Sequence, residues 1–237
     1  LSFFMVKIEY VGKCLFIQTN KNKAEEKILV IGDLHLGYEE HLNRTGVFVS
    51  RKIFEEMIFY FDNVFEKVGY VDRIILLGDV KHDFGSISNQ EWKDALALLD
   101  YLSKKLNKTG KVVIIKGNHD KMIGPIAKKR GVDVKEYFLV EDTCFLHGDK
   151  EIKEAYNEEI KHWILGHGHP AVKNSEPGGV KTEKYKCFLV GKFKGKEIIV
   201  VPSFIEANEG SDPRENDLGL AWKFNFDKFH VKIVSED

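Results

Sequence analysis

Short apolar runs that end directly in metal-binding side chains recur five times in this sequence. Each run is typical of a buried strand, and histidine, aspartate or asparagine follows it within a few positions. The segments that follow the runs are residues 32–35, 78–83, 117–120, 147–149 and 166–169. Because ligands of α/β sheets gather beyond the carboxyl ends of the strands, the five strand ends can converge in one crevice. The pattern predicts an α/β fold with its chemistry in that crevice.

The segments between the first runs predict helices that connect parallel strands. The runs predicted to be buried strands are residues 27–31, 73–77 and 111–115. An amphipathic stretch, residues 51–68, is predicted to be a helix with Ser50 as its N-cap. A second helix is predicted from Ser88 or Asn89 to about Leu106. Short apolar strands with helices between them indicate a parallel sheet covered on both faces.

Strands and tight turns dominate the remainder of the chain. Single strands are predicted at residues 143–146 and 163–165. Hairpins are predicted at residues 5–19, 184–203 and 219–234, with turns around 12–13, 191–195 and 227–228. The sequence contains no internal repeat and no long linker, so we expect a single domain over residues 1–237.

The charge balance excludes some classes of partner. The chain has 36 Lys and Arg against 37 Asp and Glu, which gives a net charge of −1. This balance excludes a polybasic coat for nucleic acid, although it permits a local basic groove. The longest apolar runs are far shorter than the roughly 18 residues that a membrane span needs. We therefore expect no association with a membrane.

The cysteines and the first residues favour a reducing compartment. Cys14, Cys144 and Cys187 are widely spaced, lie in apolar stretches and show no pairing typical of zinc sites or disulfide frameworks. Residues 1–10 lack the basic start, the long apolar core and the small-residue cleavage site of a secretory signal. We expect buried, reduced thiols and a cytoplasmic protein.

The histidines identify the chemistry of the strand ends. Six of the nine histidines lie in the five segments, namely His35, His82, His119, His147, His167 and His169. Asp33, Asp79 and Asn118 accompany them. Imidazole, carboxylate and amide donors without thiolate suit manganese, iron, zinc, nickel or cobalt. The donors are too many for one ion and sufficient for two, an arrangement that can hold a bridging hydroxide and clamp a phosphoryl oxygen.

Four motifs, in chain order, resemble those of the calcineurin-like metallophosphoesterase superfamily. They are DLH, GDVKHD, GNHD and GHGH. The stretch GDLHLGYEE further resembles the predicted ICC-like phosphoesterase subgroup of archaea and bacteria. The resemblance implies an α/β fold in which two mixed sheets, flanked by helices, form a four-layer αββα sandwich.

The resemblance also implies a role for each side chain. Two metal ions would be bound, the first by Asp33, His35 and His169 and the second by Asn118, His147 and His167. Asp79 would bridge the ions, and His119 would protonate the leaving oxygen. His82 stands where many members have aspartate. Because the repair nucleases of the superfamily have a histidine there, His82 favours phosphodiesters and a catalytic role.

These observations predict a phosphoesterase with two divalent transition-metal ions, manganese favoured, in which a metal-bridging hydroxide attacks phosphorus in line. A phosphodiesterase is favoured, acting on a phosphoester that could be a nucleotide or a nucleic acid. The alternatives are a phosphomonoesterase or nucleotide phosphatase, a DNA nuclease, and a metal-binding scaffold without activity. The complete set of ligands argues against the scaffold.

Other polar residues are expected to have structural or surface roles. Residues expected to support turns are Asp83, Asp120 and Asp149, and those expected in a solvated turn are Glu39, Glu40 and His41. His162 and His230 are expected to be structural. The basic run 128–130 is expected to be solvated rather than to bind phosphate. The polar loop 208–216 is expected to lie on the surface rather than to form a wall of the site.

Overall fold

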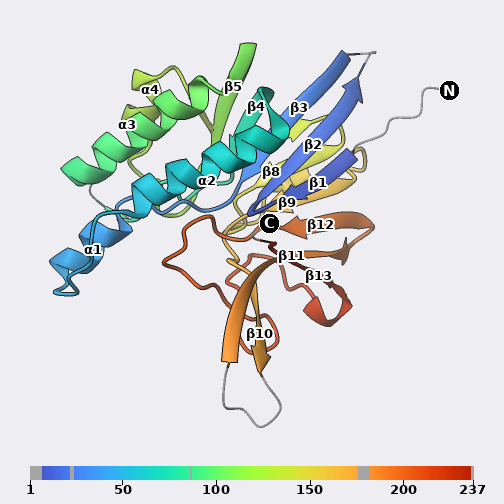
Figure 1. The fold of residues 1–237 in the computed structure, drawn as a ribbon. Helices are drawn as coiled ribbons and strands as arrows, with labels where there is room; N and C mark the ends of the chain where they lie inside the picture. Colours follow the sequence, from blue (N-terminus) through green and yellow to red (C-terminus); the bar gives the residue numbers. More distant parts are fainter. Residues whose placement is uncertain (1–6, 22–23, 86, 176–181, 236–237) are drawn as a thin grey trace.

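The first of two stacked sheets contains the strands that were predicted to be parallel. The computed structural model describes residues 7–21, 24–85, 87–175 and 182–235 (Figure 1). The sheet has the order β1-β2-β3-β4-β5-β6. Its strands are β1 (Lys7–Val11), β2 (Cys14–Lys21), β3 (Ala24–Ile31), β4 (Val71–Leu76), β5 (Leu106–Ile115) and β6 (Asp133–Lys135). The β1–β2 and β2–β3 pairs are antiparallel, whereas β3 through β6 run parallel.

The second sheet is built from the second half of the chain. Its order is β10-β11-β12-β9-β8-β7, and β13 pairs with β11. Its strands are β7 (Tyr137–Val140), β8 (Thr143–Leu146), β9 (His162–Leu165), β10 (Ala171–Ser175), β11 (Thr182–Phe193), β12 (Lys196–Val200) and β13 (His230–Ile233). The β9 strand runs parallel to both of its neighbours, β8 and β12. The predicted pair of mixed sheets is confirmed.

Three apolar cores separate four layers. The helices are α1 (Tyr38–Arg44), α2 (Ile53–Val68), α3 (Asn89–Ser103) and α4 (Gly124–Lys129), with 3-10 turns η1 (Lys153–Tyr156) and η2 (Phe226–Lys228). Helices α2, α3 and α4 lie along one side of the first sheet (Figure 1), and their side chains form a core with it. A second core lies between the sheets. The third core lies on the outer face of the second sheet, where Ala155 and Trp222 help to cover Trp163. This outer layer consists of 3-10 turns and irregular chain in the described residues.

The local predictions fail where packing or distant partners decide the conformation. The first hairpin, both single strands and the β11–β12 hairpin are confirmed, although residues 5–6 of the first hairpin lie outside the described residues. The predicted hairpin over residues 219–234 is wrong, because only β13 is a strand and it pairs with β11 instead. The second helix has Ser88 as its N-cap, in a capping box with Glu91, and it ends at Ser103.

The prediction that Ser50 caps the helix over residues 51–68 is also wrong. The helix begins at Ile53, and the carboxylate of Glu39 accepts hydrogen bonds from the backbone N–H groups of Lys52 (2.5 Å) and Ile53 (2.7 Å). Glu39 is therefore a buried residue of α1 that satisfies the start of α2, not part of a solvated turn. A negative charge at this position also interacts favourably with the helix dipole.

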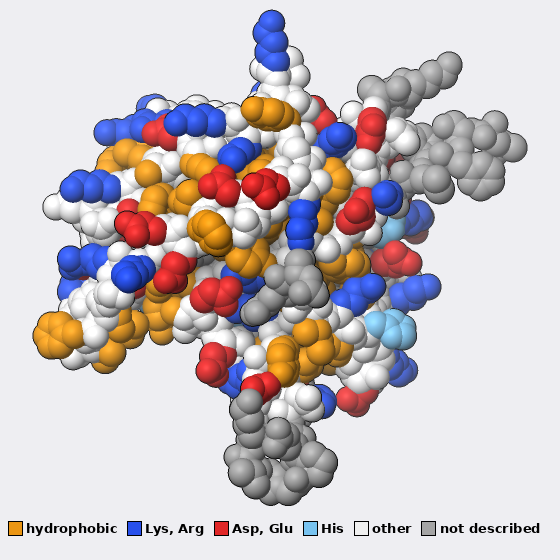
Figure 2. Space-filling model, in the orientation of Figure 1, with side chains coloured by type: hydrophobic (Ala, Val, Ile, Leu, Met, Phe, Trp, Pro, Cys, Tyr) orange, Lys and Arg blue, Asp and Glu red, His pale blue; other side chains and the backbone are white. Residues whose placement is uncertain are grey.

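The surface and the thiols agree with the composition. Acidic and basic side chains are intermixed over the face shown in Figure 2. Cys14, Cys144 and Cys187 are buried and free, and burial raises the pKa of each thiol to about 12. Within the described residues, no helix has both the length and the apolar character needed to span a membrane.

Replacement of Glu39 by alanine tests the contact between α1 and α2. We expect a loss of about 1–2 kcal/mol in the free energy of unfolding, because two N–H groups at the start of α2 lose their acceptor. Urea denaturation provides the measurement. The matched control is Glu40→Ala, which removes only the ion pair with Arg51 at the surface and should cost well under 1 kcal/mol. Equal losses in both variants would contradict the capping role.

Candidate metal centre

All five predicted segments meet at one edge of the sandwich. Asp33 follows β3, Asp79 follows β4 and Asn118 follows β5 in the first sheet, while His147 follows β8 and His167 follows β9 in the second. These strands run parallel within each sheet, so their carboxyl ends lie at the same edge. Hydrogen bonds join neighbouring segments, including those from the N–H groups of Leu34 (3.1 Å) and His35 (2.8 Å) to the carbonyl oxygen of Asp79.

One group of possible metal ligands contains Asp79, His147 and His167. Nε2 of His147 lies 3.0 Å from Oδ1 of Asn118, 3.1 Å from Nδ1 of His167 and 3.5 Å from Oδ2 of Asp79. Nδ1 of His147 donates to the carbonyl oxygen of Leu77 at 2.7 Å, which leaves Nε2 free to bind an ion. Ligand atoms about 2.1 Å from one ion lie about 3 Å apart at right angles. The four donors therefore fit one divalent ion.

A second group contains Asp33, His35 and His169. Nε2 of His169 lies 3.4 Å from Oδ1 of Asp33 and 3.4 Å from Nε2 of His35. The Asp33 carboxylate is fully buried and also accepts the backbone N–H of His167, at 3.0 Å for the closer oxygen. The donors are again imidazole and carboxylate, the chemistry that suits divalent transition metals.

Asp79 connects the two groups through a single oxygen. Oδ2 of Asp79 lies 3.5 Å from Nε2 of His147 and 3.9 Å from Nε2 of His35. Oδ1 of the same carboxylate accepts the backbone N–H of His119 at 2.9 Å, which fixes the orientation of the group. One carboxylate oxygen thus faces both groups, as a bridging ligand would.

The backbone around these ligands is unusually constrained. His35, Asp79, His167 and His169 all have positive φ, which non-glycine residues rarely adopt and which costs free energy at each position. Gly117 makes room for Asp79, since a Cβ at this glycine would lie 2.1 Å from Oδ1 of Asp79 and 2.3 Å from its backbone nitrogen. The surrounding fold maintains a costly conformation, and it does so where the ligands lie.

The electrostatics keep the carboxylates ionised and some imidazoles neutral. Burial opposes ionisation of Asp33, but the neighbouring imidazoles, with that of His169 foremost, lower its pKa below the usual range. Burial lowers the pKa of His35 to about 3. For His147, burial is outweighed by the carboxylates of Asp79 and Asp33, and its pKa rises to about 9. Because a metal ion binds only neutral imidazole, binding at His147 would release a proton.

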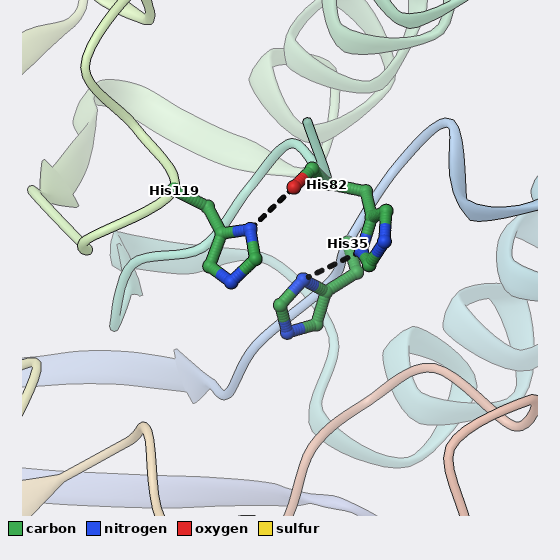
Figure 3. Close-up of side chains that lie close together, drawn as sticks. All are labelled: His35, His82 and His119. Atoms are coloured by element: carbon green, nitrogen blue, oxygen red, sulfur yellow. Dashed lines mark hydrogen bonds between the residues drawn. The ribbon is translucent and has the colours of Figure 1, made fainter. Parts of the chain in front are cut away.

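His82 and His119 lie beside His35 (Figure 3), and these three histidines form another group of possible metal ligands. Nδ1 of His119 donates to the backbone carbonyl oxygen of His82. Nε2, the other ring nitrogen of His119, lies 3.8 Å from Oδ2 of Asp79. Nδ1 of His82 lies 3.4 Å from Nδ1 of His35, and burial lowers the pKa of His82 to about 4. His82 thus contacts one possible ligand through its ring and holds His119 through its backbone.

Comparison with known proteins identifies the family. The family model described as calcineurin-like phosphoesterase matches residues 26–234. The chain belongs to this family. Comparison with the curated proteins finds no match.

Solved structures share the architecture at low sequence identity. A nuclease from Pseudomonas putida, called MPE, has a TM-score of 0.58 and 18% identity, with 88% of this chain and 91% of that chain covered. A protein of unknown function from Aquifex aeolicus has a TM-score of 0.37 and 19% identity, covering 59% of this chain and 77% of its own. For Vps29 from Entamoeba histolytica the values are 0.34 and 14%, with 74% and 73% covered. The first of these shows that the fold is shared.

The loop over residues 208–216 belongs to the site of this family member, which corrects its assignment as a plain surface loop. The side-chain amide of Asn208 lies 2.8 Å from Nδ1 of His169, and Ser211 N–H donates to the carbonyl oxygen of His169 at 2.8 Å. Lys186 donates to the carbonyl oxygen of Asn208 at 2.6 Å. Sequence reasoning missed Asn208 because its position in the sequence is unrelated to any motif. Its only sequence signal was the polar character of the loop.

The two aspartates that end the GDVKHD and GNHD motifs contact neighbouring segments, Asp120 through backbone groups and Asp83 through side chains. Asp120 is buried and accepts the N–H groups of Gly117 (3.1 Å) and Val80 (3.0 Å), and burial raises its pKa to about 6. Asp83 accepts hydrogen bonds from His41 (3.1 Å) and Arg44. His41 is therefore part of α1 and contacts the motif loop, so the prediction of a solvated turn is wrong.

The remaining polar residues are engaged at a distance from the ligands. In the basic run 128–130, Arg130 forms an ion pair with Asp100, and the Lys129 ammonium lies over the ring of Trp92. Nδ1 of His162 lies 3.4 Å from Oδ1 of Asp142, a contact that agrees with a structural role.

Substitution of Gly117 by alanine tests the packing around Asp79. We expect a loss of at least about 2 kcal/mol in the free energy of unfolding, because the new methyl group overlaps the backbone nitrogen and the carboxylate of Asp79. Thermal and urea denaturation provide the measurement. The matched control is Gly124→Ala at the start of α4, where a Cβ meets nothing within 4 Å and the change should be neutral or slightly stabilising.

Substitution of Asn208 by alanine tests the support of His169. Binding of an ion through Nε2 of His169 requires the proton on Nδ1, which the side-chain oxygen of Asn208 accepts once the amide is turned. We expect metal affinity to fall about 10- to 100-fold without this acceptor, the range typical of lost partners of metal-binding histidines. Calorimetric titration with Mn²⁺ measures the affinity of each site. Asn216→Ala, an exposed position of the same loop, should leave both affinities unchanged. Unaltered affinity in the Asn208 variant would show that the contact with His169 does not orient a ligand.

Proposed function

We propose that this member of the family is a phosphodiesterase that uses two divalent transition-metal ions, with manganese favoured over iron, nickel, zinc and cobalt. The observation that carries the proposal is the position of Asp79, whose Oδ2 faces both ligand groups at 3.5 Å and 3.9 Å. A carboxylate buried between two sets of imidazoles is the donor arrangement of a two-metal hydrolytic site.

In the proposed assignment every ligand comes from a strand end. The first ion would be held by Asp33, His35 and His169, the second by Asn118, His147 and His167, with Asp79 shared. When bound, the two ions would supply an activated water and neutralise charge on the phosphoryl oxygens. The three cysteines are buried in the apolar cores and supply no ligand in this assignment.

His119 is proposed as the general acid. Its Nδ1 proton is committed to the carbonyl oxygen of His82, so the second proton of the imidazolium lies on Nε2, toward Asp79. A leaving oxygen near Asp79 could accept that proton as its bond to phosphorus breaks. The backbone N–H of His119 donates to Asp79 at 2.9 Å, which couples the position of the acid to that of the shared ligand.

The position of His82 supports a diester rather than a monoester substrate. Its ring lies beside His119, with centroids 5.5 Å apart, and beside His35 at 5.3 Å. It is therefore on the side from which the leaving group would receive its proton. We propose that His82 helps to place a bulky leaving group there, in addition to holding His119. DNA cleavage is a second candidate activity, and the Pseudomonas putida protein that shares the fold is a nuclease.

We propose further that residues 1–237 act as a single domain in the reducing cytoplasm. The core between the sheets is built from both halves of the chain, with Ile75 and Val113 packed among Phe145 and Phe188. Such a core supports one folding unit. The three buried, unpaired thiols suit a reducing compartment.

Asp79→Asn provides the test of the shared ligand. The wild-type protein should bind two Mn²⁺ ions per chain, whereas the variant should bind no more than one tightly, because an amide is a poor bridge between cations. Calorimetry or equilibrium dialysis measures the stoichiometry. Asp149→Asn, an aspartate of the neighbouring motif outside both ligand groups, is the matched control and should still bind two ions. A wild-type stoichiometry of one would refute the dinuclear assignment.

His119→Ala provides the test of the general acid. We expect kcat to fall about 10²- to 10⁴-fold on a dinucleotide, whose alkoxide leaving group needs a proton. The loss should be clearly smaller on bis(p-nitrophenyl) phosphate, whose phenolate leaves more readily without one. Rates on p-nitrophenyl phosphate, measured in parallel, distinguish a monoesterase. Identical losses on good and poor leaving groups would assign His119 to phosphate binding instead of proton transfer.

A further inference from the structure

An exposed aromatic ring lies directly against the proposed general acid. The ring of Phe84 stacks on the imidazole of His119, with centroids 3.6 Å apart and an angle of 29° between the planes. Phe84 is nevertheless 51% exposed. His119 covers one face of the ring, and about half of Phe84 remains accessible to solvent beside the metal centre.

The residue that precedes Phe84 is held by hydrogen bonds to two helices. Asp83, the preceding residue, accepts hydrogen bonds from His41 and Arg44 of α1. Its backbone N–H donates to Glu91 of α3 at 2.9 Å. Two helices therefore hold the segment that carries Phe84, and the ring is presented to solvent from an anchored position.

We propose that Phe84 is a stacking platform for the base of the leaving nucleoside, which makes the substrate class a phosphodiester with a nucleobase on its leaving side. The inference rests on the proposed function, because His119 marks the leaving side only if it is the acid. A base of any identity has a flat π face, so one exposed ring is sufficient to bind it without a closed pocket. The imidazole, the Phe84 ring and the base would then form one stack.

The test compares substrates that differ only in the base. Thymidylyl-thymidine is hydrolysed in parallel with two analogues, each with an abasic tetrahydrofuran sugar on one side, and the product without phosphate identifies the leaving nucleoside. Phe84→Leu should lower kcat/KM about tenfold on substrates with a leaving-side base. Removal of that base should lower wild-type kcat/KM by a similar factor, and the variant should then lose nothing further. Phe84→Trp should retain at least wild-type kcat/KM on the base-containing substrates.

Each other outcome overturns the inference or the function beneath it. Equal losses by Phe84→Leu on all three substrates would mean that the ring only packs against His119, and no loss on any would give the ring no role. The tryptophan variant keeps the test valid if the leucine variant does not fold. If neither variant distinguishes substrates with a leaving-side base from those without one, stacking is refuted. If the wild-type enzyme hydrolyses bis(p-nitrophenyl) phosphate but no dinucleotide, the nucleobase assignment fails while the phosphodiesterase stands. If it hydrolyses neither, the proposed function fails as well.

Discussion

The burial of two carboxylates among imidazoles is the interaction on which the rest of this structure depends. Asp33 and Asp79 are almost completely removed from solvent, and a buried carboxylate is costly unless charges and donors compensate it. The compensation comes from His147, His169 and backbone N–H groups. Because these groups lie in segments that follow strands of both sheets, the carboxylates are stabilised only when the sheets are stacked with their strand ends at one edge.

The loops that follow the strands adopt conformations that they would not adopt alone. Positive φ at His35, Asp79, His167 and His169 has a cost that the packed cores beneath must offset. Gly117 has no Cβ, so the backbone of its loop can lie close to Asp79. The buried carboxylate of Asp120 accepts the N–H groups of Gly117 and Val80, which joins this loop to the loop that contains Asp79. Packing of the apolar strands thus stabilises the fold. Part of this stabilisation offsets the cost of the strained backbone at the strand ends, which holds the site side chains in fixed directions.

Neighbouring elements extend the site beyond its motifs. The 208–216 loop reaches His169 through Asn208, and α1 reaches the segment after His82 through Asp83. The same α1 helix satisfies the start of α2 through Glu39. The short helix α1 therefore both caps α2 and holds the segment next to the site. Substitutions in α1 should affect both the stability of the protein and the position of Phe84.

The sequence alone determined the alternating strands, the ligand types and their placement at strand ends, because apolar runs and short motifs are local features. It also indicated the family, which the match over residues 26–234 shows. Only the tertiary structure decided that one oxygen of Asp79 faces both groups, that Asn208 contacts His169 and that Phe84 covers His119. Ser50 failed as a cap, and residues 219–234 failed as a hairpin, for the same reason. The groups that take their place, Glu39 and β11, belong to other elements of the fold, and no local pattern specifies a contact that only packing creates.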